Sequence, residues 1–200
     1  MADLMADPET ITAYNSRAAE YADRFAQAEP DAIAKGFIAN LTPGARVLDL
    51  GCGPGDMAAA LRDAGCRVDA VDASQEMADI ARQRHGIDVR IADFNTIDDV
   101  ALYDGIWANF CLLHARKSDM PGHLGRLHRA LRSGGLLHLG LKLGSGERRD
   151  RIGRLYAYYT DAEITGLLDQ AGFAVTNRMF GSSAGLDGTE SPWIVLDALA

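Results

Sequence analysis

Three glycines at alternate positions, Gly51, Gly53 and Gly55, form the most informative segment of this 200-residue sequence. They follow the short apolar run 45–50, which has the character of a buried strand, and they precede residues with helical spacing. Side chains at these positions would block a ligand, so a bare turn lets the backbone approach one closely. The next helix adds free N–H groups and a positive dipole end, which can also interact with a ligand. The segment therefore predicts a ligand site at the end of the first strand.

A carboxylate follows the next predicted strand. Asp72 ends the run 67–72, 17 residues after Gly55, where a carboxylate can accept hydrogen bonds from both hydroxyls of a ribose. In isolation, Asp72 is equally well interpreted as a helix-capping acid beside Ser74. The dinucleotide fingerprint requires Gly-x-Gly-x-x-Gly, and here the last position is Asp56, which would repel a pyrophosphate. The combination favours ribose binding and disfavours NAD.

The elements that must position these residues alternate in type. We expect strands at 45–50, 67–72, 88–94, 103–113 and 134–142, with helices at 57–64, 74–85 and 120–131 between them. Further helices are expected at 8–27, 31–41 and 160–170, and two last strands at 173–180 and 192–199. A repeating strand–helix order requires a parallel sheet covered on both faces, because right-handed crossovers place the helices there. The last two strands have only a loop between them and can form an antiparallel hairpin.

From Tyr14 to the C-terminus the sequence resembles the class I methyltransferases that depend on S-adenosylmethionine (SAM), of the small-molecule type that includes the UbiE and tellurite-resistance-like enzymes. The resemblance rests on segment 49–55, on Asp72, on the pair Asp93 and Phe94, on 103–114, and on 131–135, where Ser133 replaces the usual proline. It implies an α/β fold with a Rossmann-like, seven-stranded, mostly parallel sheet, an antiparallel last strand, helices on both faces and an N-terminal helical lid. Residues 1–200 are then one domain, with a helical cap at 1–42 and a Rossmann-like core at 43–200.

The resemblance also implies SAM as cofactor and S-adenosylhomocysteine as product. Asp49 is expected to meet the methionine ammonium through water, and Asp72 to hold the ribose. The remaining cofactor-binding residues are expected to be Gly51, Cys52, Gly53, Gly55, Ala73, Met77, Asp93, Phe94, Asn109, Phe110 and Tyr21. Met77 has an equally good interpretation as a core residue of its helix, and Tyr21 as a packing residue of the lid.

The acceptor side has fewer signals. His114 lies at the carboxyl end of the fourth predicted strand, where open parallel sheets bind ligands, and is a candidate general base or a structural histidine. The other four histidines are expected at the surface or in the core. Candidate substrate residues, suited to a polar or anionic small molecule, are Tyr14, Lys142, Arg154 and Tyr158. The Arg-rich segment 147–154 has interleaved acids and is also interpreted as a solvated loop.

Composition narrows the partners and the location. The net charge of -8 argues against a nucleic-acid surface, which needs a basic stripe. No window is apolar enough for a membrane span, residues 1–4 carry an acid where a secretory signal would be basic, and the expected location is cytoplasmic. The three cysteines match neither a zinc site nor a disulfide framework, and no metal is expected.

The sequence thus predicts SAM-dependent methyl transfer to a small-molecule acceptor by in-line displacement, with no nucleic-acid or membrane partner. It leaves the oligomeric state and three alternatives open. These are a SAM-binding protein without catalysis (a sensor or partner subunit), a methyltransferase acting on a macromolecule, and a nucleotide-binding oxidoreductase.

Overall fold

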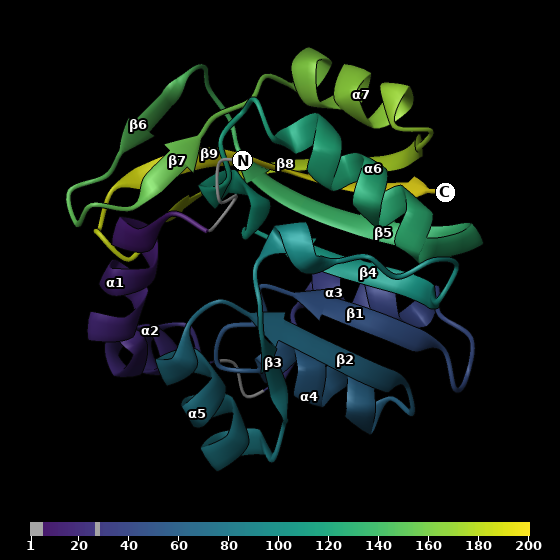
Figure 1. The fold of residues 1–200 in the computed structure, drawn as a ribbon, viewed down its shortest axis with the longest axis horizontal. Helices are drawn as coiled ribbons and strands as arrows, with labels where there is room; N and C mark the ends of the chain where they lie inside the picture. Colours follow the sequence, from purple (N-terminus) through teal and green to yellow (C-terminus); the bar gives the residue numbers. More distant parts are fainter. Residues whose placement is uncertain (1–5, 27–28) are drawn as a thin grey trace.

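A computed structural model describes residues 6–26 and 29–200 (Figure 1). Segment 1–4, on which the signal-peptide argument rests, lies outside the described residues, as does the last position of the predicted helix 8–27. None of the described helices has the length and apolar character needed to cross a membrane.

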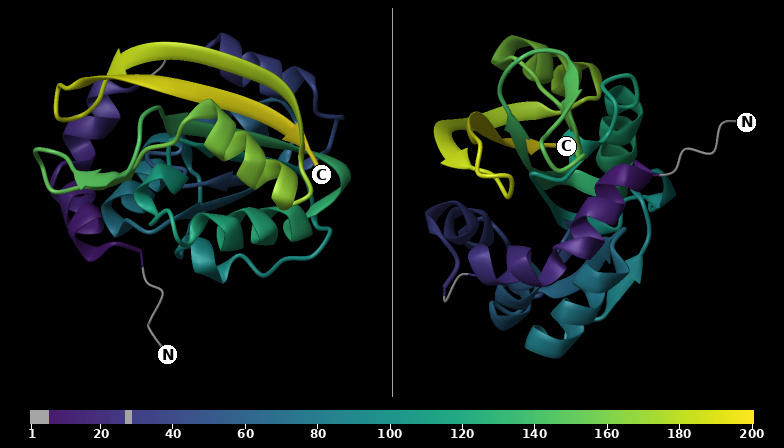
Figure 2. Two further views of the ribbon diagram at one scale, coloured as in Figure 1. Left: turned by 90° about the horizontal axis from the view of Figure 1, so that it is seen from above. Right: turned by 90° about the vertical axis from the view of Figure 1, so that its left-hand side faces the viewer.

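The central feature is a seven-stranded sheet with the strand order β3-β2-β1-β4-β5-β9-β8. Its strands are β1 (Arg46–Leu50), β2 (Arg67–Asp72), β3 (Val89–Ile91), β4 (Tyr103–Asn109), β5 (Leu131–Lys142), β8 (Ala174–Ala184) and β9 (Glu190–Leu199). Strands β1 to β5 are parallel, whereas β9 is antiparallel to both β5 and β8. The long strands β8 and β9 run side by side as the predicted hairpin (Figure 2). The predicted sheet, including its antiparallel last strand, is confirmed.

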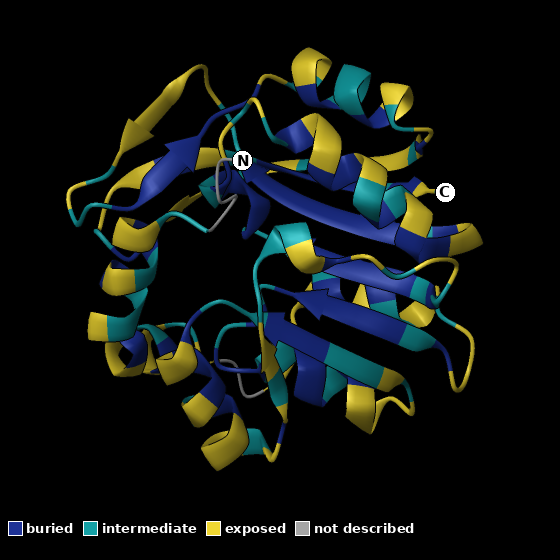
Figure 3. Cartoon of the chain, viewed as in Figure 1, coloured by how far each residue is buried: buried dark blue, intermediate teal, exposed yellow. Residues whose placement is uncertain are grey.

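Helices cover both faces of the sheet, as a buried parallel sheet requires. One face packs against α3 (Ala32–Ala39), α4 (Asp56–Asp63) and α5 (Gln75–His85), and the other against α6 (Met120–Ala130) and α7 (Asp161–Gln170). The two core layers alternate along β1, where Val47 joins the α3 side and Leu48 the α6 side. Figure 3 shows the result, with buried central strands and helices exposed on their outer sides.

The predicted helix 8–27 is in fact two helices, α1 (Pro8–Ser16) and α2 (Ala18–Arg24). Arg17 separates them with non-helical angles, φ -127° and ψ 18°. The Ser16 hydroxyl donates to the carbonyl of Ala13, a local bond of the kind that competes with helix continuation. The break lets the two helices bend across the carboxyl edge of the sheet, where both contact α5.

Several strand boundaries differ from the prediction, and those of β4 and β3 shape the site. Strand β4 stops at Asn109 because Phe110 has a positive φ of 55°, and the 3-10 helix η2 (Leu112–His114) follows. Strand β3 is only Val89–Ile91, and Asp93 then caps the 3-10 helix η1 (Phe94–Thr96). Strand β5 begins earlier than predicted, at Leu131, with a register shift before Leu136.

An additional two-stranded sheet was missed by the sequence prediction. It pairs β6 (Glu147–Arg149) with β7 (Leu155–Ala157) in antiparallel fashion. Strand β6 lies within segment 147–154, the segment interpreted as a solvated loop, and β7 directly follows that segment. Strand β6 is exposed, but every residue of β7 is buried. Each strand has only three residues, too few for an alternating pattern to be visible in the sequence.

Candidate functional site

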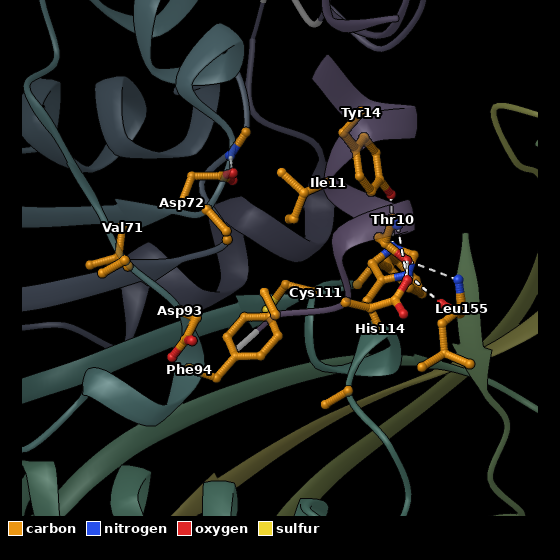
Figure 4. A pocket seen from close by; sticks show the side chains of 18 of the residues that line it. Thr10, Ile11, Tyr14, Val71, Asp72, Asp93, Phe94, Cys111, His114 and Leu155 are labelled. Atoms are coloured by element: carbon orange, nitrogen blue, oxygen red, sulfur yellow. Dashed lines mark hydrogen bonds between the residues drawn. The ribbon is translucent and has the colours of Figure 1, made fainter. Parts of the chain in front are cut away.

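A cavity of about 300 Å³ opens at the carboxyl edge of the sheet, between the sheet and α1. Figure 4 shows Thr10, Ile11 and Tyr14 of α1 on one side and Asp72, Asp93 and Phe94 from the strand ends on the other. The lining includes residues that follow β1, β2, β3 and β4, together with Leu155 of β7. This is the location where open α/β sheets bind ligands, and its volume lies at the lower end of the range for small-molecule sites.

The glycine turn and Asp72 form one wall of the cavity. The N–H of Gly53 donates to Oδ2 of Asp72 at 2.8 Å, and the N–H of Ser74 donates to Oδ1 at 2.8 Å. Each carboxylate oxygen has a further lone pair for an incoming hydroxyl. Burial raises the pKa of Asp72, while the backbone bonds oppose this shift. The two features singled out in the sequence are therefore in direct contact and face the same space.

Gly51 and Gly53 have positive φ values of 67° and 52°, which favour glycine. A Cβ on Gly51 would lie 2.3 Å from the Cβ of Cys111, the residue after the strained Phe110. At Gly53 the nearest neighbour of such an atom is the Tyr21 ring, at 3.9 Å. Gly51 thus allows two loops to pack closely, whereas Gly53 presents bare backbone to the cavity.

Asp49 lies near the end of β1 and is only 1% exposed. Its Oδ2 atom is buried and has no hydrogen-bond partner among the described residues. Burial, with a contribution from the charge of Asp72, raises the pKa of Asp49 to about 8. A backbone hydrogen bond from Ala58 opposes this shift. A buried carboxyl oxygen without a partner is costly unless a cation or donor arrives. Asp49 does not itself line the cavity, but it fits the role of a carboxylate awaiting the cationic part of a ligand.

Apolar and aromatic side chains line the part of the cavity that follows β2 and β3. Met77 is 2% exposed and also belongs to the lining, so it packs in the core and borders the cavity. Asp93 accepts from the N–H of Asn95 through Oδ1, and Phe94 packs edge-on against His123. Ala73 completes this wall. The residues suit a flat, largely apolar ring with a polar rim.

His123 is a wall residue that the sequence prediction placed only at the surface or in the core. It is 4% exposed, and its Nδ1 atom has no hydrogen-bond partner among the described residues. The contact with Phe94 arises because the N-terminal part of α6 packs against η1, and no local pattern in the sequence indicates this.

His114 lies at the acceptor end of the cavity, held by α1 and β7. Its Nδ1 lies 2.6 Å from the carbonyl of Leu155, and its Nε2 lies 2.8 Å from the hydroxyl of Tyr14. A carbonyl only accepts, so Nδ1 carries the hydrogen and Nε2 accepts from Tyr14. Arg154 donates to the same hydroxyl at 2.9 Å. Burial lowers the pKa of His114 to about 3, with a further contribution from Arg154, so the imidazole is neutral.

The helices α1 and α2 cover the cavity and are tied to both of its sides. Asp7 receives two 2.8 Å bonds from Arg149 of β6, and the Thr10 hydroxyl accepts from the N–H of Leu155. On the opposite side, the Ser74 hydroxyl donates to Asn15 at 2.6 Å. Tyr14 and Tyr21 both line the cavity, and their rings meet edge-on. The geometry is that of the lid implied by the resemblance.

Two candidate cofactor residues in the glycine segment lie away from the cavity wall. A Cβ on Gly55 would lie 2.8 Å from the Cβ of Ala81, so this glycine serves the packing of α4 against α5. Cys52 is buried in the core between the same helices. Gly51, Gly53, Asn109 and Phe110 do line the cavity.

Three candidate substrate residues are likewise not part of the lining. Arg154 is 2% exposed and paired with Asp150, which contradicts the interpretation of 147–154 as a solvated loop. The ammonium of Lys142 lies over the ring of Tyr156, and Tyr158 is buried under Arg148. Arg154 donates to the Tyr14 hydroxyl. Lys142 and Tyr158 both pack against Tyr156 of the unpredicted strand β7, and the Tyr156 ring packs on His114.

Comparison with known proteins agrees with this geometry. Residues 47–135 match the family model of a methyltransferase domain. A malonyl-[acyl-carrier protein] O-methyltransferase of Enterobacter lignolyticus is 38% identical over 95 residues, which are 46% of this chain and 37% of that protein. A trans-aconitate 2-methyltransferase of Mycolicibacterium gilvum is 48% identical over 50 residues, 24% of this chain and 19% of that protein. The chain thus spans 37% of the length of the first of these relatives and 19% of the second.

Among solved structures, a 1,6-didemethyltoxoflavin-N1-methyltransferase of Burkholderia thailandensis, with bound 1,6-didemethyltoxoflavin and S-adenosylhomocysteine, has the same fold. The TM-score is 0.76 at 24% identity, and the superposition covers 100% of this chain and 92% of the other.

Proposed function

We propose that the chain is a class I SAM-dependent methyltransferase that transfers a methyl group from SAM to a small-molecule acceptor, a proposal supported by the match of residues 47–135 to the family model of a methyltransferase domain. The observation that carries the proposal is the wall shared by the bare turn at Gly53 and the carboxylate of Asp72, which face one cavity. We also propose that residues 1–200 act as one domain, with the cap 1–42 closing over the core 43–200.

The lining residues supply a partner for each part of SAM. Asp72 would hold the ribose through its remaining lone pairs, and Asp93, Phe94 and Met77 would enclose the adenine. The unpaired carboxyl of Asp49 would balance the ammonium of the methionine portion. When bound, SAM supplies a methyl group on positively charged sulfur, and this methyl carbon is open to attack by an acceptor in line with the carbon–sulfur bond.

The chain's own task is to exclude water and to hold the acceptor in line. Because positive charge disperses in this transfer, no oxyanion hole is needed. The lid supplies the closure, through Thr10 against Leu155 and Tyr14 against His114. The neutral His114 orients the Tyr14 hydroxyl at the acceptor end.

The acceptor is proposed to be a small molecule because the cavity is covered by the lid and holds about 300 Å³. By their names, the relatives reported above act on malonyl-[acyl-carrier protein], on trans-aconitate and on 1,6-didemethyltoxoflavin, so their acceptors differ and include one that is bound to a protein. The net charge of -8 also disfavours nucleic acid.

The test combines binding and turnover. Calorimetric titration should show one SAM site per chain, and a panel of small acceptors should give S-adenosylhomocysteine release. SAM binding without release for any acceptor would favour the non-catalytic sensor. Binding of NADH in place of SAM would overturn the proposal.

A further inference from the structure

The acceptor end of the cavity lacks a group that can take a proton. Both ring nitrogens of His114 are engaged, Nδ1 by the Leu155 carbonyl and Nε2 by the Tyr14 hydroxyl. The Tyr14 oxygen in turn accepts from Arg154 while its hydrogen points to His114. A proton on Nε2 would displace this arrangement, because nitrogen and hydroxyl would then both be donors toward each other.

The groups around His114 also oppose a positive charge there. The Arg154 guanidinium and the Lys142 ammonium both act on it, from the turn before β7 and from β5. The ring of Tyr156 packs on it at 4.6 Å, and Tyr14 caps it from α1. Asp150, the one acid that acts in the opposite direction, is paired with Arg154. An amine, phenol or thiol that must lose a proton therefore finds no base in His114 or Tyr14.

Arg116, two residues after His114 in the chain, adds a cation to the lining of the cavity. It is the only Lys or Arg among the described residues that line the cavity. It follows η2, which turns His114 inward and leaves Arg116 exposed at the mouth. Its side chain has no ion pair or hydrogen bond within the described part of the chain, unlike Arg149 and Arg154, which have the partners Asp7 and Asp150. A guanidinium group without a partner is suited to bidentate binding of a carboxylate.

Among the acidic residues of the described lining, one could bind the acceptor in place of Arg116. Asp7 is paired with Arg149, Asp72 accepts two backbone N–H groups, and Asp93 accepts one. Asp119 accepts only from the hydroxyl of Ser118 and forms no ion pair with Arg116 or another described residue. A cationic acceptor would use Asp119, and an anionic acceptor would use Arg116.

We infer that the acceptor is a carboxylic acid that enters already ionised and is bound by Arg116, an inference that rests on the proposed methyl transfer. A carboxylate oxygen bonds to the methyl carbon, and the carbon–sulfur bond breaks with its electron pair remaining on sulfur. The products are a methyl ester and S-adenosylhomocysteine, and no proton has to be moved. A carboxylate suits a site whose lining offers the cation Arg116 and whose His114 and Tyr14 are not free to take a proton.

The experiment uses the full chain with SAM and a panel of succinate, benzoate and phenylacetate against benzylamine, phenol and thiophenol. We expect S-adenosylhomocysteine release with acids only, a base-labile ester product, and a kcat/KM that is flat from about pH 6 to 9, since a carboxylate is ionised throughout. Arg116→Gln should raise KM for acids roughly tenfold to hundredfold, as expected for a lost charged hydrogen bond. Asp119→Asn should lower KM by removing a like charge, and Arg151→Gln, an exposed arginine outside the cavity, should change nothing.

Methylation of the amine or phenol at a rate that rises with pH, with KM raised in Asp119→Asn and not in Arg116→Gln, would overturn the inference and leave the proposed function intact. If no panel member turns over, the same compounds are titrated into the S-adenosylhomocysteine complex. Acid binding that is lost in Arg116→Gln supports the inference, and its absence in the wild type contradicts it. Failure of SAM itself to bind would contradict the proposed function instead.

Discussion

Asp49 is a residue whose hydrogen-bonding capacity is not fully satisfied in the ligand-free protein. Its carboxyl is buried with one oxygen unpaired, and burial moves its pKa from 3.8 to about 8. Between about pH 4 and 8 the folded state therefore retains a proton that the unfolded state has released. Because the folded state binds more protons in this window, the free energy of unfolding falls as the pH rises. The unpaired carboxyl thus lowers stability in order to be available to a ligand.

Replacing Asp49 with Asn should remove this dependence. We expect Asp49→Asn to gain stability relative to the wild type between pH 5 and 8, by up to about 1.4 kcal/mol per pH unit. Urea unfolding at both pH values without SAM measures the difference. The same variant should bind SAM more weakly, because an amide does not balance an ammonium. Parallel pH profiles for the two proteins would show that Asp49 is not protonated in the free enzyme.

Asp72 gives a second prediction at the level of one residue. Asp72→Ala removes the acceptors for the ribose and for the N–H groups of Gly53 and Ser74. We expect the free energy of SAM binding to weaken by about 1.5–3 kcal/mol, the range for a charge-assisted hydrogen bond. Calorimetry measures the affinity, and a circular dichroism melt checks that the variant is folded. An unchanged affinity in a folded variant would remove the ribose assignment.

The lid helices α1 and α2 are held by contacts with residues distant in sequence. One of these contacts, the ion pair between Asp7 at the start of α1 and Arg149 of β6, can be tested by mutation. Arg149→Gln breaks the bidentate pair with Asp7. Because the pair is partly exposed, it contributes about 0.2–1 kcal/mol, so we expect SAM affinity to fall by less than about sixfold. Hydrogen exchange in residues 8–24 should quicken, and high salt should have the same effect on the wild type. An exchange rate equal to that of Arg151→Gln would show that this pair does not hold the lid.

Most elements could be predicted because the signals that specify them are local. The apolar run before Gly51, the Ser74 cap and the capping box at Thr160 each act within a few residues. Strand β7 could not be predicted, because its burial depends on α1 covering it. The break at Arg17 also escaped prediction, since the apolar stripe continues through it and only a Ser16 side-chain bond marks the end of α1.

The residues of the candidate site also divide into those that could be predicted from local signals and those that could not. Gly53 and Asp72 could be identified because each directly follows a strand of a parallel sheet, and such ends share one edge. Arg116 and His123 could not, because their places depend on the path of η2 and the docking of α6. Arg154 was misinterpreted because its burial requires Tyr14, 140 residues earlier in the chain, as well as Asp150.

At the scale of the whole molecule, the cavity is assembled from α1, four strand ends and β7, so it exists only when the entire fold is formed. A ligand of this cavity binds the folded state alone and must stabilise it. At a SAM concentration one hundred times Kd, the gain is about 2.7 kcal/mol, which for a chain of this size corresponds to a rise of about 5–11 °C in Tm. A thermal melt with and without SAM measures it, with Asp72→Ala as the matched variant that should show a smaller rise. A rise with NADH and none with SAM would mean that the cavity binds a dinucleotide, since both ligands would act through the same fold and only the one that fits can stabilise it.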